Sequence, residues 1–283
     1  MNWLIEPIIT FEFMRNALII SILLGIVCAV VGSYLVVERL SLLGNVISHA
    51  VLPGLSIAFF LGINLEFGAF IAGTSSALVV AWIRSQSPVN VDAAMAVVLS
   101  GFLGLGVMLI KLLRTNTIDL SSILFGDILG VTPTDLVQTA IATLIILILV
   151  KMFYRELLYY TFDPLGAQAF GLPVNLIYFC LIAAVTLTII ASMQTVGVLM
   201  VISLLIAPAS TAYLLVKELH QMMLLGSIIG VLGSVSGMYL SYYLDLPSGP
   251  AIVLVIFAFF FLAFFFSPNH GILLRYWRGK DGG

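Results

Sequence analysis

Long uninterrupted runs of apolar residues are the feature that most constrains this 283-residue chain. A helix needs about 20 apolar residues, at about 1.5 Å each, to cross the hydrocarbon core of a membrane. The runs predict nine such helices, at 15–37, 40–62, 65–83, 91–113, 133–152, 174–193, 196–216, 222–243 and 249–266. The number falls to eight if one short or interrupted segment does not cross. Because the runs are continuous rather than alternating, they predict an all-α polytopic transmembrane helical bundle and exclude a β-barrel.

The composition excludes several classes of protein. Apolar residues make up 62% of the chain and charged residues only 8%, whereas soluble domains carry about 25% charged residues. So few charges cannot cover a water-facing surface, which rules out a cytosolic enzyme, a nucleic-acid binder and a disordered scaffold. The sequence contains no linker to a second soluble domain, so we expect a single transmembrane domain over residues 1–283.

The basic residues predict an orientation. With nine spans and the N-terminus outside, eight of them fall on the cytoplasmic side and three outside, in keeping with the positive-inside tendency. The cytoplasmic set is Arg39, Arg84, Lys151, Arg155, Lys217, Arg275, Arg278 and Lys280, and the outer set is Arg15, Lys111 and Arg114. Three connections are long: an outer segment at 114–132 with a short amphipathic stretch, a cytoplasmic segment at 153–173, and a basic cytoplasmic tail at about 267–283.

His49 is the exception among the ionisable residues, which otherwise lie at span ends or in loops. In a span that begins near Leu40, His49 lies about 13 Å along the helix, close to the bilayer midplane. An ionisable residue at that depth indicates a functional site. Asn45 lies one turn earlier on the same face, and Pro53, four residues later, frees a backbone carbonyl near that face. The alternative is a structural histidine that hydrogen-bonds across helices, and Asn45 has the same alternative.

Pro208 interrupts another span, in the segment LLIAPASTAYLL. Its kink either lines a pathway or shapes helix packing, and Ser210 and Thr211 can satisfy the freed backbone. The sequence has no GxxxxGK[ST] phosphate loop, no HExxH and no GxSxG. The spans also lack the several buried charges typical of ion-coupled carriers. These absences favour a transport subunit that is not itself an enzyme and takes its energy from a partner.

Several segments resemble the metal-cation class of ABC-type importer permeases, which move manganese, zinc or iron into bacteria. They are LSLLGNVISHAVLPGLSIAFFLG at 40–62, TIDLSSILFGDIL at 117–129, FDPLGAQAFGLPVN at 162–175, MQTVGVLMVISLLIAPASTAYLL at 193–215 and the closing SPNHG. The resemblance covers nearly the whole chain. It implies a multi-pass protein of the bacterial plasma membrane that binds no cofactor tightly and pairs with a second permease copy, identical or paralogous. It also implies a cytoplasmic pair of ATPase subunits, which bind the ATP, and an extracytoplasmic metal-binding protein.

The resemblance also implies roles for particular residues. His49 matches the family's pathway histidine, and Asn45 stands where members carry an aspartate. Oxygen ligands with imidazole suit manganese or ferrous iron, so we expect manganese as the cargo, with zinc or ferrous iron next. The segment at about 160–173 matches a coupling helix that docks on the ATPase; the matching residues are Asp163, Ala167, Ala169, Gly171 and Pro173. An ordinary interfacial helix is the alternative there.

Two other functions remain open from the sequence. The chain could be a permease for iron chelates or vitamin B12, which would require a larger central cavity lined without His49. It could also be a membrane-embedded enzyme or a structural subunit of a larger complex. Enzyme chemistry would require a further titratable group facing His49.

Overall fold

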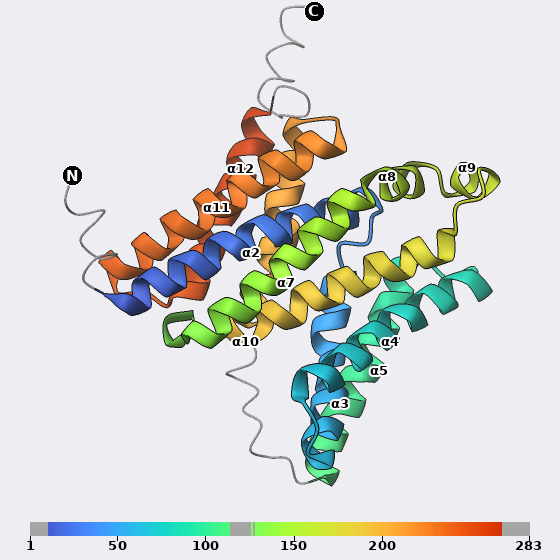
Figure 1. Cartoon of the computed structure of the whole chain (residues 1–283), viewed down its shortest axis with the longest axis horizontal. Coiled ribbons are helices and arrows are strands. Elements are labelled where there is room, and N and C mark those ends of the chain that lie inside the picture. The colour runs from blue at the N-terminus through green and yellow to red at the C-terminus, as the bar shows by residue number, and fades with distance from the viewer. Residues whose placement is uncertain (1–10, 114–125, 127, 268–283) are drawn as a thin grey trace, which may run out of the picture.

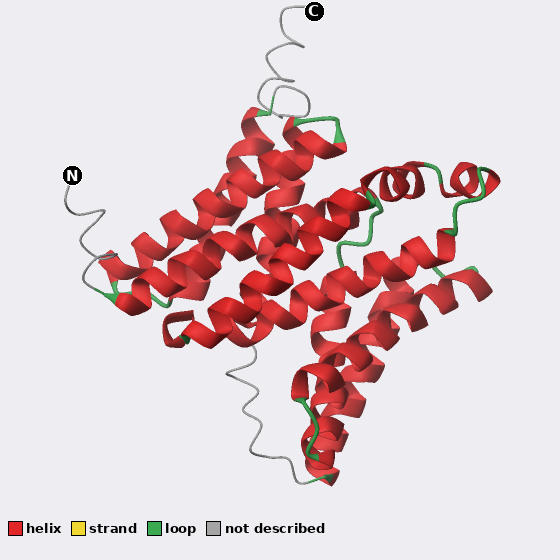
Figure 2. Cartoon of the chain, viewed as in Figure 1, coloured by secondary structure: helices red, strands yellow, loops and turns green. Residues whose placement is uncertain are grey.

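The computed structural model describes residues 11–113, 126 and 128–267, and every regular element within them is a helix (Figures 1 and 2). The elements are α2 (Glu12–Val37), α3 (Leu43–Leu61), α4 (Leu65–Gln86), α5 (Val91–Leu112), the short 3₁₀ helix η1 (Ile128–Gly130), α7 (Pro133–Met152), α8 (Tyr154–Phe162), α9 (Pro164–Ala169), α10 (Val174–Leu215), α11 (Leu219–Leu244) and α12 (Ser248–Phe266). In this part of the chain nine segments are long and apolar enough to cross a membrane, because α10 contains two of them. The expected helical bundle is confirmed, with the larger of the two span numbers.

Two of the expected connections fall largely outside the described residues. They are the outer segment at 114–132, with Arg114, and the basic tail at about 267–283, with Arg275, Arg278 and Lys280.

Two of the spans, α4 and α7, begin at side-chain caps. Asn64 precedes α4, and its side-chain oxygen accepts hydrogen bonds from the backbone N–H groups of Glu66 (2.7 Å) and Phe67 (3.2 Å). Thr132 and Asp135 form a reciprocal capping box at the start of α7, with Asp135 Oδ2 2.9 Å from Thr132 N. Such caps satisfy backbone donors that have no partner within the helix. They place Glu66 and Asp135 in the first turns of two spans that both pack on α10.

Gly197 divides α10 into two spans, Val174–Met193 and Thr195–Leu215. Its backbone has φ 77° and ψ 157°, a conformation that residues with a side chain rarely adopt. Gly126 packs directly on this break: a Cβ atom at Gly126 would collide with the backbone of Val196 and Gly197. Two separate requirements for glycine therefore fix the kink between the two spans.

The spans form two groups with α7 and α10 between them (Figure 1). One group contains α3, α4 and α5, and the other contains α2, α11 and α12. Small residues bring the helices together, because a Cβ atom at Gly54 of α3 would overlap the backbone of Gly68 in α4. Gly25 of α2 and Gly230 of α11 make an equally close pair. Backbone contact of this kind is typical of helix packing in membranes.

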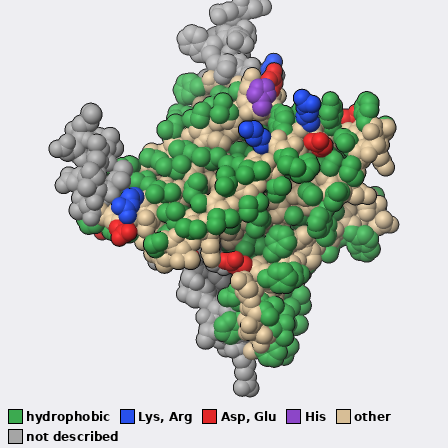
Figure 3. Space-filling view, in the orientation of Figure 1, with side chains coloured by type: hydrophobic (Ala, Val, Ile, Leu, Met, Phe, Trp, Pro, Cys, Tyr) green, Lys and Arg blue, Asp and Glu red, His purple; other side chains and the backbone are tan. Residues whose placement is uncertain are grey.

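The outer surface is largely apolar (Figure 3). The spans α5, α7 and α12 are the least buried, whereas α2 and α3 lie mostly inside the bundle. Large side chains such as Trp82, Leu112 and Met152 are about two-thirds exposed. This pattern suits a surface that contacts lipid.

The bundle has two ends that differ in what they carry. At one end lie α8, α9 and the connection from α4 to α5, and we call it the α8–α9 end. At the other lie the first turns of α4 and α7 and the break at Gly197, and we call it the Glu66 end. These two ends frame the sites described next.

Candidate transport site and coupling segment

Asn45 and His49 lie one turn apart on the same face of α3, and both side chains are half-buried. Neither makes a hydrogen bond or an ion pair with the residues that the structure describes. Because α3 begins at Leu43 rather than near Leu40, His49 lies about 9 Å from the start of a helix about 28 Å long. The distance along the helix is therefore shorter than the expected 13 Å, and the pair lies nearer the α8–α9 end; the depth of His49 in the bilayer stays a prediction.

Pro53 lies inside α3 and is buried. It has no N–H, so the carbonyl of His49, four residues earlier, loses its helical donor. The proline ring also packs on α5, since a Cβ atom at Gly106 would lie 3.0 Å from Pro53 Cδ. Pro53 thus frees an oxygen at the turn that carries His49 and joins α3 to its neighbour.

The groups on this face that could bind a metal ion are few and neutral. They are the Asn45 amide oxygen, a His49 ring nitrogen and the freed carbonyl of His49. In the described parts of the chain, no group of three or more His, Cys, Asp or Glu side chains converges on one point. Manganese takes about six ligands, so these three groups alone are too few for a complete coordination sphere.

Pro208 is buried in the second span of α10. Its carbonyl oxygen and the Cα of Ala209 lie beside Gly226 of α11, where a Cβ atom would meet them at 3.5 and 3.6 Å. The Thr211 hydroxyl donates to the Ala207 carbonyl at 2.7 Å. These contacts support the interpretation that the interruption shapes the packing of α10 on α11.

The segment from α8 to α10 forms two short helices that project from the bundle (Figure 1). Asp163 caps α9, and its Oδ1 accepts a hydrogen bond from the Gly166 N–H at 2.9 Å. Pro164 follows at the first helical position, where the lack of an N–H costs nothing. Asp163 is itself exposed, so it fixes the fold of this segment and remains accessible.

Gly171 ends α9 in a Schellman motif. The Gly171 N–H donates to the Gln168 carbonyl and the Leu172 N–H to the Ala167 carbonyl, both at 3.0 Å. Gly171 has φ 80°, which the motif requires and which favours glycine. Of the other residues expected in the coupling segment, Ala167 is buried, and Ala169 and Pro173 are exposed.

Two apolar residues of this segment were missed by the sequence interpretation. Leu165 is 79% exposed and Phe170 is 85% exposed, the highest values among the large apolar side chains of the described chain. They lie on α9 and at its C-cap. The signal was available, because they are bulky apolar residues within a short polar connection predicted to face water.

Glu38, directly after α2, connects the bundle to α8. The Thr161 hydroxyl donates to Glu38 Oε1 at 3.2 Å, across 123 positions of sequence. Burial raises the pKa of the Glu38 carboxyl to about 7, although the Thr161 hydrogen bond and the nearby charge of Arg84 act in the opposite direction. This carboxyl is therefore close to half-ionised at neutral pH.

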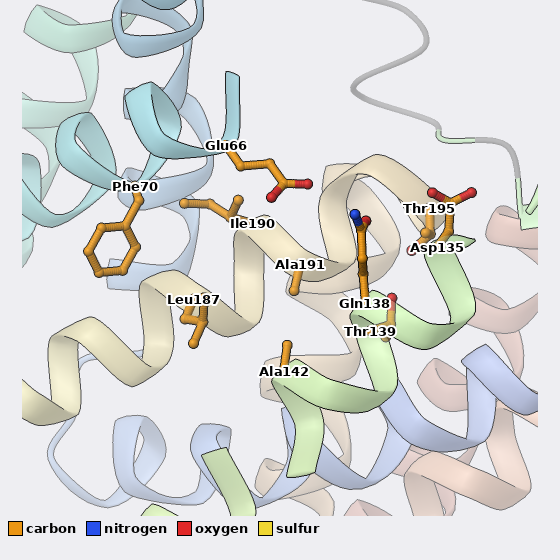
Figure 4. Close-up of a pocket in the computed structure, with 10 residues that line it drawn as sticks. All are labelled: Glu66, Phe70, Asp135, Gln138, Thr139, Ala142, Leu187, Ile190, Ala191 and Thr195. Carbon is orange, nitrogen blue, oxygen red and sulfur yellow. The ribbon is translucent and has the colours of Figure 1, made fainter. Parts of the chain in front are cut away.

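A cavity of about 160 Å³ opens at the Glu66 end, between α4, α7 and the break in α10 (Figure 4). Glu66 and Phe70 of α4 form one wall. The first two turns of α7, with Asp135, Gln138 and Thr139, form another. The cavity is separate from the Asn45–His49 pair, since neither residue lines it.

Comparison with known proteins identifies the family. The model of the ABC 3 transport family matches residues 10–267. The chain belongs to this family. It is therefore a multi-pass membrane protein with a transport role, and the resemblance seen in the sequence is confirmed.

Individual relatives are similar over nearly their full length. The manganese transport system membrane protein MntC of Halalkalibacterium halodurans is 41% identical over 99% of this chain and 96% of its own. A probable iron transport system membrane protein of Haemophilus influenzae is 38% identical over 94% of this chain and 97% of its own. The structure of PsaBC from Streptococcus pneumoniae in complex with Fab superposes with a TM-score of 0.85 at 38% identity, covering 98% of both chains.

Proposed function

We propose that this chain is the transmembrane permease subunit of an ATP-driven importer of divalent metal ions in a bacterial plasma membrane, with manganese as the main cargo. Family membership supports the transport role. The names of similar permeases support manganese ahead of iron. The observation that carries the site is the Asn45–His49 face of α3, which is half-buried and has no partner within the described chain.

The open face supports pairing with a second permease copy. Two copies of α3 facing each other would supply two amide oxygens and two imidazoles, with freed carbonyls and water completing the sphere of a manganese ion. Because Asn45 is neutral, the site would bind the ion more weakly than a site with aspartate. Weak binding suits transit, since the ion has to leave as well as enter.

The coupling segment would connect this site to the energy source. A separate pair of ATPase subunits would bind and hydrolyse ATP and contact α8 and α9. Leu165 and Phe170 would provide apolar anchors in the ATPase surface, and Gly171 would hold their geometry. With α8 and α9 cytoplasmic, the Glu66 end faces outward, toward a binding protein that delivers the metal.

Metal uptake by His49→Ala and Asn45→Asp variants tests the site. In cells that lack other importers, His49→Ala should reduce manganese uptake by at least about tenfold, because the pathway loses its imidazole ligand. Asn45→Asp should tighten binding and shift preference among manganese, zinc and ferrous iron, because it adds two negative charges per dimer.

The control is Asp92→Asn, a charge change at an exposed position in the first turn of α5. All variants are compared at equal membrane abundance. Unchanged uptake by His49→Ala would exclude a pathway role for this residue. Unchanged metal preference in Asn45→Asp would make position 45 structural.

A further inference from the structure

The cavity at the Glu66 end gathers oxygen-bearing side chains from separate helices. Glu66 comes from α4, Asp135, Gln138 and Thr139 from α7, and Thr195 from the start of the second span of α10. Its floor is apolar, formed by Ala142, Leu187, Ile190 and Ala191. Figure 4 shows Glu66 and Gln138 reaching into the cavity from different walls.

The acidic side chains keep free oxygens there. The Glu66 carboxylate has no hydrogen bond or ion pair with any described residue; its own backbone N–H is what Asn64 caps. Asp135 uses Oδ2 for its capping box with Thr132, so Oδ1 remains available. The lining contains no Lys, Arg or His among the residues that the structure places.

Thr139 provides an independent indication of a ligand. Its side chain is only 2% exposed, lies one turn below Asp135 and lines the cavity. Its hydroxyl has no hydrogen-bond partner in the described structure, whereas the neighbouring Thr195 hydroxyl donates to the Ser192 carbonyl at 2.9 Å. This hydroxyl is not among the enclosed polar atoms that lack a partner, so it opens into the cavity, where a bound ion or its water can satisfy it.

Helix ends of both signs meet at this cavity, because α4, α7 and the second span of α10 begin there. The first span of α10 ends at this cavity, where Ile190 and Ala191 belong to its last turn before the break at Gly197. The C-terminal end of a helix carries a partial negative charge from its unpaired carbonyls. This charge and the two carboxylates offset the positive ends of α4, α7 and the second span of α10.

The size and donor set fit a partly hydrated ion rather than a tightly held one. At about 30 Å³ per water, a cavity of about 160 Å³ holds an ion that keeps several waters. Two carboxylates with amide and hydroxyl oxygens form a hard-oxygen environment suited to manganese or magnesium. The absence of a third converging His, Cys, Asp or Glu in the described chain agrees with weak binding.

We propose that this cavity is a low-affinity capture site for a hydrated divalent cation, with Glu66 as its main charged ligand. Gln138, Thr139 and the free oxygen of Asp135 complete the oxygen environment. The inference rests on the proposed function for its place on the outer side, where the ion would be held before it reaches the α3 face.

Manganese binding to the purified full-length permease with its ATPase subunits tests the proposal. The parent carries His49→Ala, which removes the imidazole of the α3 site, and free Mn²⁺ is measured by electron paramagnetic resonance. Glu66→Gln in this parent should weaken the remaining binding about tenfold, because the site loses a charge. Thr139→Val, which preserves volume, should weaken it about threefold by removing one donor oxygen.

Asp245→Asn is the matched control. Asp245 lies at the same end, outside the cavity, and has φ 53°, a conformation that asparagine also adopts. It should leave Mn²⁺ binding unchanged. Binding that is equal in the parent, Glu66→Gln and Thr139→Val overturns the capture site. Loss of binding in Asp245→Asn equal to that in Glu66→Gln also overturns it, because diffuse surface charge would then account for the effect.

The two proposals fail separately. If His49→Ala does not affect uptake but Glu66→Gln weakens Mn²⁺ binding, the capture site stands and the role of His49 falls. If His49→Ala abolishes uptake and Glu66→Gln leaves binding unchanged, the capture site falls and the transport function stands.

Discussion

Glu38 makes the stability of the permease depend on pH. Its folded pKa of about 7 lies above the ordinary value for a glutamate, so between about pH 4.5 and pH 7 the folded chain holds a proton that the unfolded chain has released. The contribution of this group to stability therefore falls as the pH rises through that window. Glu38→Gln, which mimics the neutral form, should be more stable than the wild type at pH 8 and about equal to it at pH 5.

Thermal unfolding of the purified permease, followed by tryptophan fluorescence, measures this difference. The relevant value is the change in Tm between variant and wild type at each pH, which cancels the titration of other groups. Arg84, Thr161 and the phenols of Tyr34, Tyr160 and Tyr178 surround the carboxyl and are present in both proteins. A Tm difference that is the same at pH 5 and pH 8 would contradict the pKa assignment.

Residues differ in how far the sequence alone reveals them. His49 could be singled out because an ionisable group within an apolar run is costly to keep in a membrane unless it serves a function. Glu66 gave no such signal, because it sits at a span end like most charges in the chain. Its relevance depends on Thr139, which lines the same cavity from another helix, and Glu38 and Thr161 are likewise brought together only by the fold.

Among the short elements, the Schellman motif of α9 leads to a prediction about coupling. A Cβ atom at Gly171 would meet nothing within 4 Å, so a substitution there strains only the backbone. Gly171→Val should therefore distort α9 and reduce metal transport per ATP hydrolysed by at least about threefold, because a branched residue resists positive φ. Uptake and ATPase activity measured on the same vesicles give this ratio.

Gly171→Asn provides the matched control. Asparagine tolerates the left-handed conformation, so this variant should keep the wild-type ratio. If Val and Asn substitutions uncouple equally, then side-chain bulk against the ATPase, rather than the conformation of α9, controls coupling.

The spans themselves were predictable, but some of their ends were not. Apolar runs locate a helix to within a few residues. The start of α3 differs because the residues from Glu38 to Leu42 form turns between two apolar runs, and no strong cap marks Leu43. This shift of three residues places His49 about 9 Å, rather than 13 Å, along its helix. By contrast, the start of α7 matches the prediction, and it carries proline and a capping box.

The bundle as a whole depends on close helix contacts, which a further variant tests. Gly54→Leu would force α3 and α4 apart and should lower the free energy of unfolding by about 1–3 kcal/mol, as overpacking does in protein cores. The Tm and the yield of monodisperse protein report this loss. Gly101→Ala is the control, since a Cβ atom there meets nothing within 4 Å. Equal stability of the two variants would show that the contact between α3 and α4 yields easily.

The apolar pattern of the sequence does not predict how the helices pack against one another. The sequence predicts how many helices cross and which ends share a side. It does not predict that α3, α4 and α5 form one group and α2, α11 and α12 another, because helix pairing depends on small-residue contacts between distant segments. The orientation with the N-terminus outside remains a prediction from charge placement.

The break at Gly197 gives the first half of α10 the properties of a lever. This half is a continuous helix of 20 residues, about 30 Å long. One of its ends is joined to α9 through Pro173, and the other forms the floor of the Glu66 cavity. This half can tilt as one body, and Gly197 beyond it, whose backbone is not helical, can act as the pivot. In the proposed orientation, a push on α9 at the cytoplasmic surface would therefore move the floor of the Glu66 cavity on the far side of the membrane.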